Sequence, residues 1–133
     1  MAEKISGYLY VNGGKLYYEA AGAWRAIVFI HAGIADQRMW DDQFDLFAQT
    51  HRVVRYDTRG FGQTTSENVE FSNRADVRAL LDHLGIDQAV LIGCSRGGQI
   101  ATDTTIESPE RVAALITVGS GPGGFTEGDI SDE

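Results

Sequence analysis

Ser95 lies in a motif that suits a nucleophilic serine. Positions 93–98 read GCSRGG and follow the apolar run Ala89–Ile92, which fits the pattern G-x-S-x-G at a strand-to-helix junction. Gly93 and Gly97 let neighbouring backbone pass this sharp turn without a Cβ collision. The pattern predicts an exposed, strained Ser95 hydroxyl suited to covalent acyl chemistry. The alternative is a helix N-cap serine, which requires no flanking glycines.

A second segment can supply hydrogen bonds to a reacting oxygen. The apolar run Ala26–Ile30 leads into His31-Ala32-Gly33, and the helix expected from Arg96 directs unpaired N–H groups to the same place. The N–H groups of Gly33 and Arg96 are therefore candidate donors of an oxyanion hole, where losing one donor costs about 3 kcal/mol of barrier. Only the main chain of Arg96 is implied, and we expect its guanidinium to point to solvent or to a carboxylate.

A third segment follows another apolar run, Val53–Tyr56, and reads DTRGFG at positions 57–62. Together with HAG at positions 31–33 and GCSRGG at positions 93–98, it resembles the motifs of the α/β-hydrolase superfamily. The likeness covers the chain from its N-terminal hairpin to Val118, and Ala32 departs from the usual glycine.

The resemblance implies roles for particular residues. It makes Ser95 the nucleophile and assigns the oxyanion hole to Gly33 and Arg96. It also implies structural roles at the site for His31, Asp57, Arg59, Gly93 and Gly97.

Short apolar runs alternate with helical stripes along most of the chain. An Asn12-Gly13-Gly14 turn predicts an N-terminal β-hairpin between Tyr8–Val11 and Leu16–Tyr18. The alternation after it predicts an α/β fold, with a mostly parallel sheet and helices on both faces. The expected strands are Ala26–Ile30, Val53–Tyr56, Ala89–Ile92 and Val112–Val118, and the expected helices lie at Trp40–Ala48, at Val77–Leu84 and between Ser95 and Pro109.

The chain has no histidine after Ser95 to act as its base. The superfamily order is nucleophile, acid, then histidine, whereas His31, His51 and His83 all precede Ser95. Only 15 residues follow Val118, fewer than the roughly 30 that each further βα unit needs. We therefore expect residues 1–133 to be the N-terminal part of a single domain, truncated before the lid and the last strands and nearly inactive alone.

Truncation at this point has consequences for association. It would leave the strand Val112–Val118 as an apolar sheet edge, which favours pairing with other chains. We expect the partner to be a C-terminal remainder of the same domain or a second copy.

Cys94, the only cysteine, is expected to be a small buried thiol.

Composition and spacing argue against several other classes of protein. The 133 residues carry 19 acidic and 11 basic side chains, a net charge of −8 that opposes binding to nucleic acid or anionic membranes. The longest apolar run is too short to span a bilayer, and we expect a cytoplasmic protein without a metal or cofactor.

The GSGPGG run at positions 119–124 mimics a dinucleotide fingerprint but is followed by an acidic segment without a helical stripe.

These observations predict a serine hydrolase that cleaves an ester, a lactone or a related small acyl substrate through an acyl-enzyme on Ser95. Carbon–carbon bond hydrolases and cofactor-free perhydrolases share the motifs and remain open. Serine rather than aspartate at this position argues against haloalkane dehalogenase and epoxide hydrolase chemistry. Because the base is missing, two alternatives also stay open, namely a non-catalytic ligand-binding or signalling module and an inactive fragment.

Overall fold

The N-terminal hairpin is present and is longer than predicted. In the computed structural model, which describes residues 3–119, β1 (Ile5–Val11) pairs antiparallel with β2 (Gly14–Ala21). Gly13 has a φ of 67°, a backbone conformation that favours glycine, and a Cβ there would lie 2.3 Å from a methyl carbon of Val69. The Asn-Gly-Gly turn therefore fixes the register of the hairpin.

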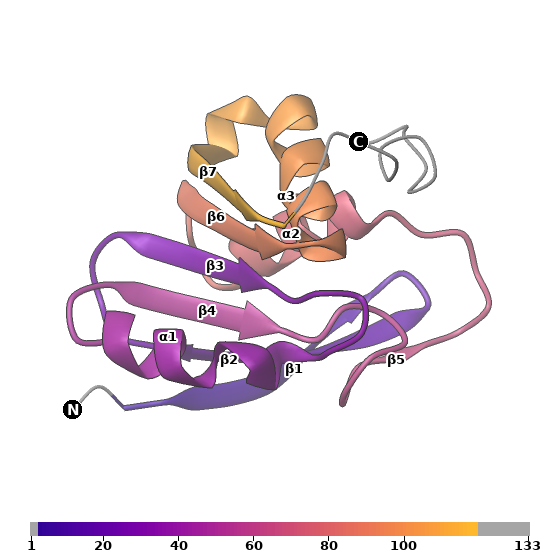
Figure 1. Ribbon diagram of the computed structural model, residues 1–133. Helices are drawn as coiled ribbons and strands as arrows, with labels where there is room; N and C mark the ends of the chain where they lie inside the picture. The colour runs from indigo at the N-terminus through magenta and orange to yellow at the C-terminus, as the bar shows by residue number, and fades with distance from the viewer. Residues whose placement is uncertain (1–2, 120–133) are drawn as a thin grey trace, which may run out of the picture.

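The following strands form the parallel part of one mixed sheet (Figure 1). These strands are β3 (Ala26–Ile30), β4 (Arg52–Tyr56), β6 (Ala89–Cys94) and β7 (Val112–Val118), all at predicted positions. The sheet order is β1-β2-β4-β3-β6-β7, with β2 antiparallel to β4. A two-residue strand, β5 (Thr65–Ser66), pairs with β2 and was not predicted.

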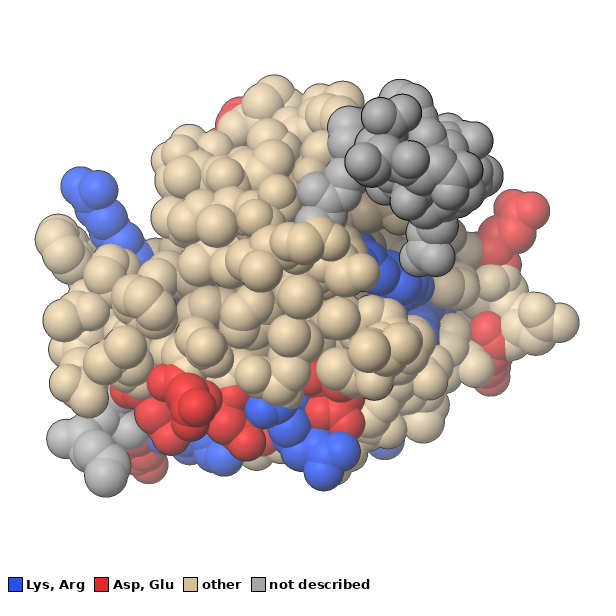
Figure 2. All heavy atoms as spheres, in the orientation of Figure 1, with Lys and Arg blue, Asp and Glu red and all other residues tan. Residues whose placement is uncertain are grey.

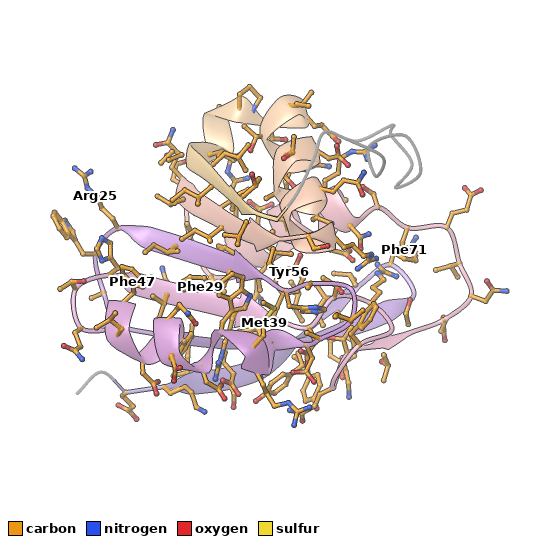
Figure 3. All side chains as sticks on the ribbon, viewed as in Figure 1. Arg25, Phe29, Met39, Phe47, Tyr56 and Phe71 are labelled. Atoms are coloured by element: carbon orange, nitrogen blue, oxygen red, sulfur yellow. The ribbon has the colours of Figure 1, made fainter. Side chains whose placement is uncertain are left out.

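Helices cover both faces of the sheet, as the sequence predicts. On one face lie η1 (Gln37–Trp40) and α1 (Asp41–Phe47), whose Trp40 and Phe44 pack with Phe29 of β3. On the other face lie α2 (Asn73–His83) and α3 (Arg96–Glu107), followed by the short η2 (Pro109–Arg111). Figure 3 shows Phe29 and Phe47 in the layer between α1 and the sheet.

The last described strand is poorly covered. Six of the seven β7 residues are exposed, including Leu115, Ile116 and Val118. On the face shown in Figure 2, charged atoms gather along the edge occupied by α1, and uncharged atoms cover the region of β6 and β7. Cys94 at the end of β6 is half-buried rather than buried, which corrects the prediction, because it packs at the rim of the α1-side core.

The helices of residues 3–119 include none that is long and apolar enough to cross a membrane. Within the same residues, histidine, cysteine and carboxylate side chains form no group able to hold a metal ion.

Candidate active site

The strand register brings the three predicted segments to one edge of the sheet. Ile30, the last residue of β3, is paired with Tyr56 at the end of β4 and with Gly93 near the end of β6. The segments that follow these strands therefore begin side by side, although they lie far apart in the sequence. This edge is where α/β sheets bind their ligands.

Ser95 occupies the sharp turn between β6 and α3. Its backbone has φ 53° and ψ −115°, a strained conformation for a residue with a side chain, and the residue is exposed. Its N–H donates to the Val118 carbonyl at 2.9 Å, and its carbonyl accepts the Gln99 N–H at 3.2 Å. The Ser95 side chain makes no capping hydrogen bond to α3, so it is not a helix N-cap serine in the ordinary sense.

The two flanking glycines are required by the close approach of backbone atoms. A Cβ on Gly93 would lie 2.2 Å from the Gly97 carbonyl oxygen, and a Cβ on Gly97 would lie 2.1 Å from the Ile30 carbonyl oxygen. Neither position can hold a larger residue unless β3, β6 or α3 moves. The glycines therefore let α3 start directly against β3 and β6.

The loop after β3 contacts the residue that follows Ser95. A Cβ on Gly33 would lie only 3.1 Å from Cδ of Arg96, so the two segments are in van der Waals contact. Arg96 is the first residue of α3, and its N–H therefore has no acceptor within the helix. Gly33 thus lies against Arg96, the residue that directly follows Ser95.

His31 is fully buried and uses both ring nitrogens within the protein. Its Nδ1–H donates to the Ala32 carbonyl at 2.7 Å, and its Nε2 accepts the Thr58 N–H at 2.9 Å. Burial lowers the pKa of the imidazole and so favours its neutral form. These contacts fit a residue that braces the loops and leave no nitrogen for a proton from Ser95.

Asp57 ties three segments together from a buried position. Its carboxylate accepts the N–H groups of Gln37 and Gln63, each at 2.8 Å, and its own N–H donates to the Tyr17 carbonyl at 3.0 Å. Gly62 must be glycine because a Cβ there would lie 2.2 Å from the Asp57 carboxylate. Asp57 thus holds the turn after β4 against β2 and against the start of η1.

Arg59 likewise acts within the structure rather than at the reacting centre. Its guanidinium donates to both carboxylate oxygens of Asp76 on α2, at 2.8 and 3.1 Å, and to the Asn12 carbonyl. It also lies 4.5 Å from the centroid of the Phe71 ring. The buried ion pair fastens the segment after β4 to the first turns of α2.

The Arg96 side chain differs from its prediction. Its Nη1 donates to the Thr58 hydroxyl at 3.2 Å, and the guanidinium carbon lies 5.4 Å from the centroid of the Phe61 ring. We expect the guanidinium to point to solvent or to a carboxylate. The β3–β4–β6 register instead places the loop after β4 within reach of the Arg96 guanidinium. Thr58 and Phe61 are the site residues that sequence reasoning missed, and their place inside the DTRGFG motif was the available signal.

The other two histidines contact different parts of the protein. His51 Nδ1 lies 2.8 Å from the Thr50 hydroxyl, just before β4 begins, and His83 Nε2 lies 3.2 Å from the Tyr18 hydroxyl at the end of α2. Among the described residues, no histidine is therefore placed to serve Ser95 as a base. The GSGPGG run beyond Gly119 and the acidic residues after it lie outside the described residues.

Comparisons with known proteins match this geometry to one family. A family model described as alpha/beta hydrolase fold matches residues 25–130. The 2-hydroxy-6-oxo-6-phenylhexa-2,4-dienoate hydrolase of Comamonas testosteroni is 32% identical over 118 residues, which are 83% of this chain and 41% of that protein. The soluble epoxide hydrolase of Corynebacterium sp. (strain C12) is 29% identical over 122 residues, covering 90% of this chain and 43% of that protein.

A solved structure gives the same result. The structure of Est816, described as an N-acyl homoserine lactone degrading enzyme, superposes with a TM-score of 0.83 at 35% identity and covers 86% of this chain and 46% of that one. The relatives with which this chain aligns are hydrolases, and the chain spans less than half the length of these three.

Proposed function

The chain belongs to the α/β-hydrolase fold family, and on that premise we propose that the intact protein is a serine hydrolase acting on an ester, a lactone or a related small acyl substrate. Ser95 is the nucleophile. The acid and the histidine of the triad come from sequence that the longer relatives have and that this chain does not span. No cofactor enters the reaction.

The observation that carries the proposal is the conformation of Ser95. An exposed serine with a φ of 53°, held between two glycines that backbone contacts require, is costly to maintain. A serine that only ended a strand or capped a helix would need none of these features. A protein keeps strain of this kind where a hydroxyl must be presented to a substrate.

The reaction follows from the arrangement of these groups. The base takes the proton of the Ser95 hydroxyl as the oxygen attacks the carbonyl carbon, and the carbonyl oxygen becomes an oxyanion. The N–H groups of Gly33 and Arg96 donate hydrogen bonds to that oxyanion. The C–O bond then breaks, the leaving oxygen takes the proton from the base, and water hydrolyses the acyl-enzyme by the same steps.

The names of the similar proteins include both acyl and epoxide substrates, and the residue at position 95 favours acyl substrates. The printed names include a lactone-degrading enzyme and a hydrolase of a dienoate, as well as an epoxide hydrolase. By the family resemblance, epoxide opening uses an aspartate nucleophile, whereas this chain has serine. The serine therefore supports acyl transfer.

Labelling of the full-length protein with a fluorophosphonate probe tests the proposal. We expect one labelled serine, lost in Ser95→Ala and kept in Ser66→Ala, which alters an exposed serine of β5. Hydrolysis of p-nitrophenyl esters should fall by about 10⁶-fold in Ser95→Ala, as when a catalytic serine is removed from a well-studied protease.

Two results would count against a serine hydrolase. Labelling that persists in Ser95→Ala would place the nucleophile elsewhere. A full-length protein that turns over no ester, yet is stabilised by a ligand equally with and without the Ser95 hydroxyl, would be a binding module.

A further inference from the structure

The side chain of Arg96 is held in one place beside the nucleophile. It is half-buried, its Cδ packs against Gly33, and its guanidinium lies over the Phe61 ring and donates to the Thr58 hydroxyl. These contacts come from the loops after β3 and β4, while Arg96 itself begins α3. The guanidinium is thus fixed at the centre of the three segments that form the site.

This guanidinium is unlike the buried arginines elsewhere in the protein. Arg55 is paired with Glu19 at 2.7 Å, and Arg59 is paired with Asp76 at 2.8 Å. Within residues 3–119, Arg96 forms no ion pair with a carboxylate, although it lies at the edge where a ligand would bind. A half-buried charge without a counter-charge is unfavourable, and a bound anion would relieve that cost.

A mostly polar hollow extends from Arg96 between α3 and the start of α2. Its walls include Gln99 and Asp103 of α3, together with Asn73 of α2 and Ser72, which caps that helix. Gln99 lies one turn after Ser95 and donates its N–H to the Ser95 carbonyl, so the hollow begins beside the nucleophile. Arg74 of α2 also lines the hollow, but it is paired with Glu107, so Arg96 is the arginine of the hollow that has no carboxylate partner among residues 3–119.

We propose that the Arg96 guanidinium binds a carboxylate of the substrate, so that the substrate class is an acyl compound carrying a carboxylate close to the scissile carbonyl. This inference rests on the proposed function of Ser95. A guanidinium presents paired N–H donors whose geometry matches the two oxygens of a carboxylate. The main-chain N–H of Arg96 then donates to the oxyanion, and the Arg96 side chain binds the carboxylate of the same substrate.

The test compares charged and uncharged esters in the full-length protein. The substrates are the mono-p-nitrophenyl esters of succinic, glutaric and adipic acids, and the methyl esters of the same compounds, which lack the charge. The readout is the ratio of kcat/KM for the carboxylate substrate to kcat/KM for its methyl ester. Any loss that both substrates share, such as disturbance of the oxyanion hole, cancels in this ratio.

We expect the wild-type ratio to exceed one for at least one chain length and to fall at least about tenfold in Arg96→Met, because charge-assisted hydrogen bonds are among the strongest in proteins. Arg96→Lys keeps the charge and should recover part of the ratio. Arg25→Met is the matched control, since Arg25 also pairs with no carboxylate of the described residues and precedes β3 at its amino end (Figure 3). It should leave the ratio unchanged.

Failure of this inference can be told apart from failure of the proposed function. If the methyl esters are hydrolysed through Ser95 but Arg96→Met keeps the wild-type ratio at every chain length, the carboxylate site is wrong and the serine hydrolase stands. A ratio that falls equally in Arg25→Met would show a general charge effect and would also overturn the site. If no ester is hydrolysed and Ser95 is not labelled, both proposals fail.

Discussion

His31 shows how single hydrogen bonds decide the role of a residue near a nucleophile. It is the histidine that the sequence places at the carboxyl edge near Ser95, where the family resemblance implies a structural role for it. The structure commits its Nδ1 to Ala32 and its Nε2 to Thr58, which lies 27 residues away. Burial also lowers its pKa and so disfavours protonation. A base must accept a proton, and this environment opposes that.

The buried His31 predicts a pH dependence of stability. Because its folded-state pKa lies below the unfolded value near 6.5, the unfolded chain binds more protons as the pH falls. The stability that neutral His31 contributes is therefore complete above about pH 6.5 and is lost as the pH falls toward the folded-state pKa. The contribution to the slope is at most about 1.4 kcal/mol per pH unit.

Urea denaturation of the full-length protein at pH 7.5, 6.5 and 5.5 measures this effect. We expect the wild type to lose more of its free energy of unfolding over this range than His31→Gln, which lacks the titrating ring. Parallel curves for the two proteins would show that His31 binds its proton equally in both states.

At the scale of elements, the β6–α3 junction stores strain. The positions of β3, β6 and α3 are set by the backbone contacts of Gly93 and Gly97, and Ser95 must then take the φ and ψ that connect the strand to the helix. Backbone strain of this kind costs about 1–3 kcal/mol. The site therefore gains an exposed hydroxyl at the expense of stability.

Glycine and alanine at position 95 should reveal this strain. Both remove the hydroxyl, but glycine adopts the conformation at position 95 without a Cβ penalty. The greater freedom of glycine in the unfolded chain lowers this gain in stability by about 0.4–1 kcal/mol. We expect Ser95→Gly to be more stable than Ser95→Ala by about 1 kcal/mol in chemical denaturation of the full-length protein.

The same pair of substitutions at Ser66 is the control. Ser66 lies in the extended β5 strand and has no positive φ, so alanine should be the more stable there. If alanine is also the more stable at position 95, the turn is not strained in solution.

At the scale of the whole molecule, β7 is a strand with one neighbour among the described residues. It pairs with β6 along one edge, most of its residues are exposed, and its sequence carries no charged side chain. Natural sheets protect such edges with charges, bulges or covering elements. An edge of this kind favours pairing with another strand.

We expect residues 1–133, expressed alone, to self-associate in sedimentation velocity experiments. A lysine at the exposed Ile116 should reduce the association, because charge on an edge strand opposes pairing. Tyr10→Lys on β1, at the opposite edge of the sheet, should have no such effect. A stable monomer of residues 1–133 would contradict the prediction.

Much of the fold follows from local sequence signals. The Asn-Gly-Gly turn, the four apolar runs and the glycine-flanked Ser95 each depend on residues close together in the chain, and the structure places a hairpin, four strands and a strand-to-helix turn at these positions. The two-residue β5 escaped prediction because a strand so short has no periodicity to detect.

The details of the site depend on contacts between distant residues. Arg96 reaches Thr58, and Thr58 contacts His31, because the strand register aligns Ile30 with Tyr56 and with Gly93. Arg59 pairs with Asp76 of α2, which lies 17 residues further along the chain. Sequence by itself determined the hairpin, the four longer strands after it and which serine lies at the turn, because these follow from steric and hydrophobic preferences of neighbouring residues. Only the tertiary structure decided which groups the two His31 nitrogens bind and that Arg96 pairs with no carboxylate of residues 3–119, because hydrogen bonds and ion pairs depend on where remote side chains are brought together.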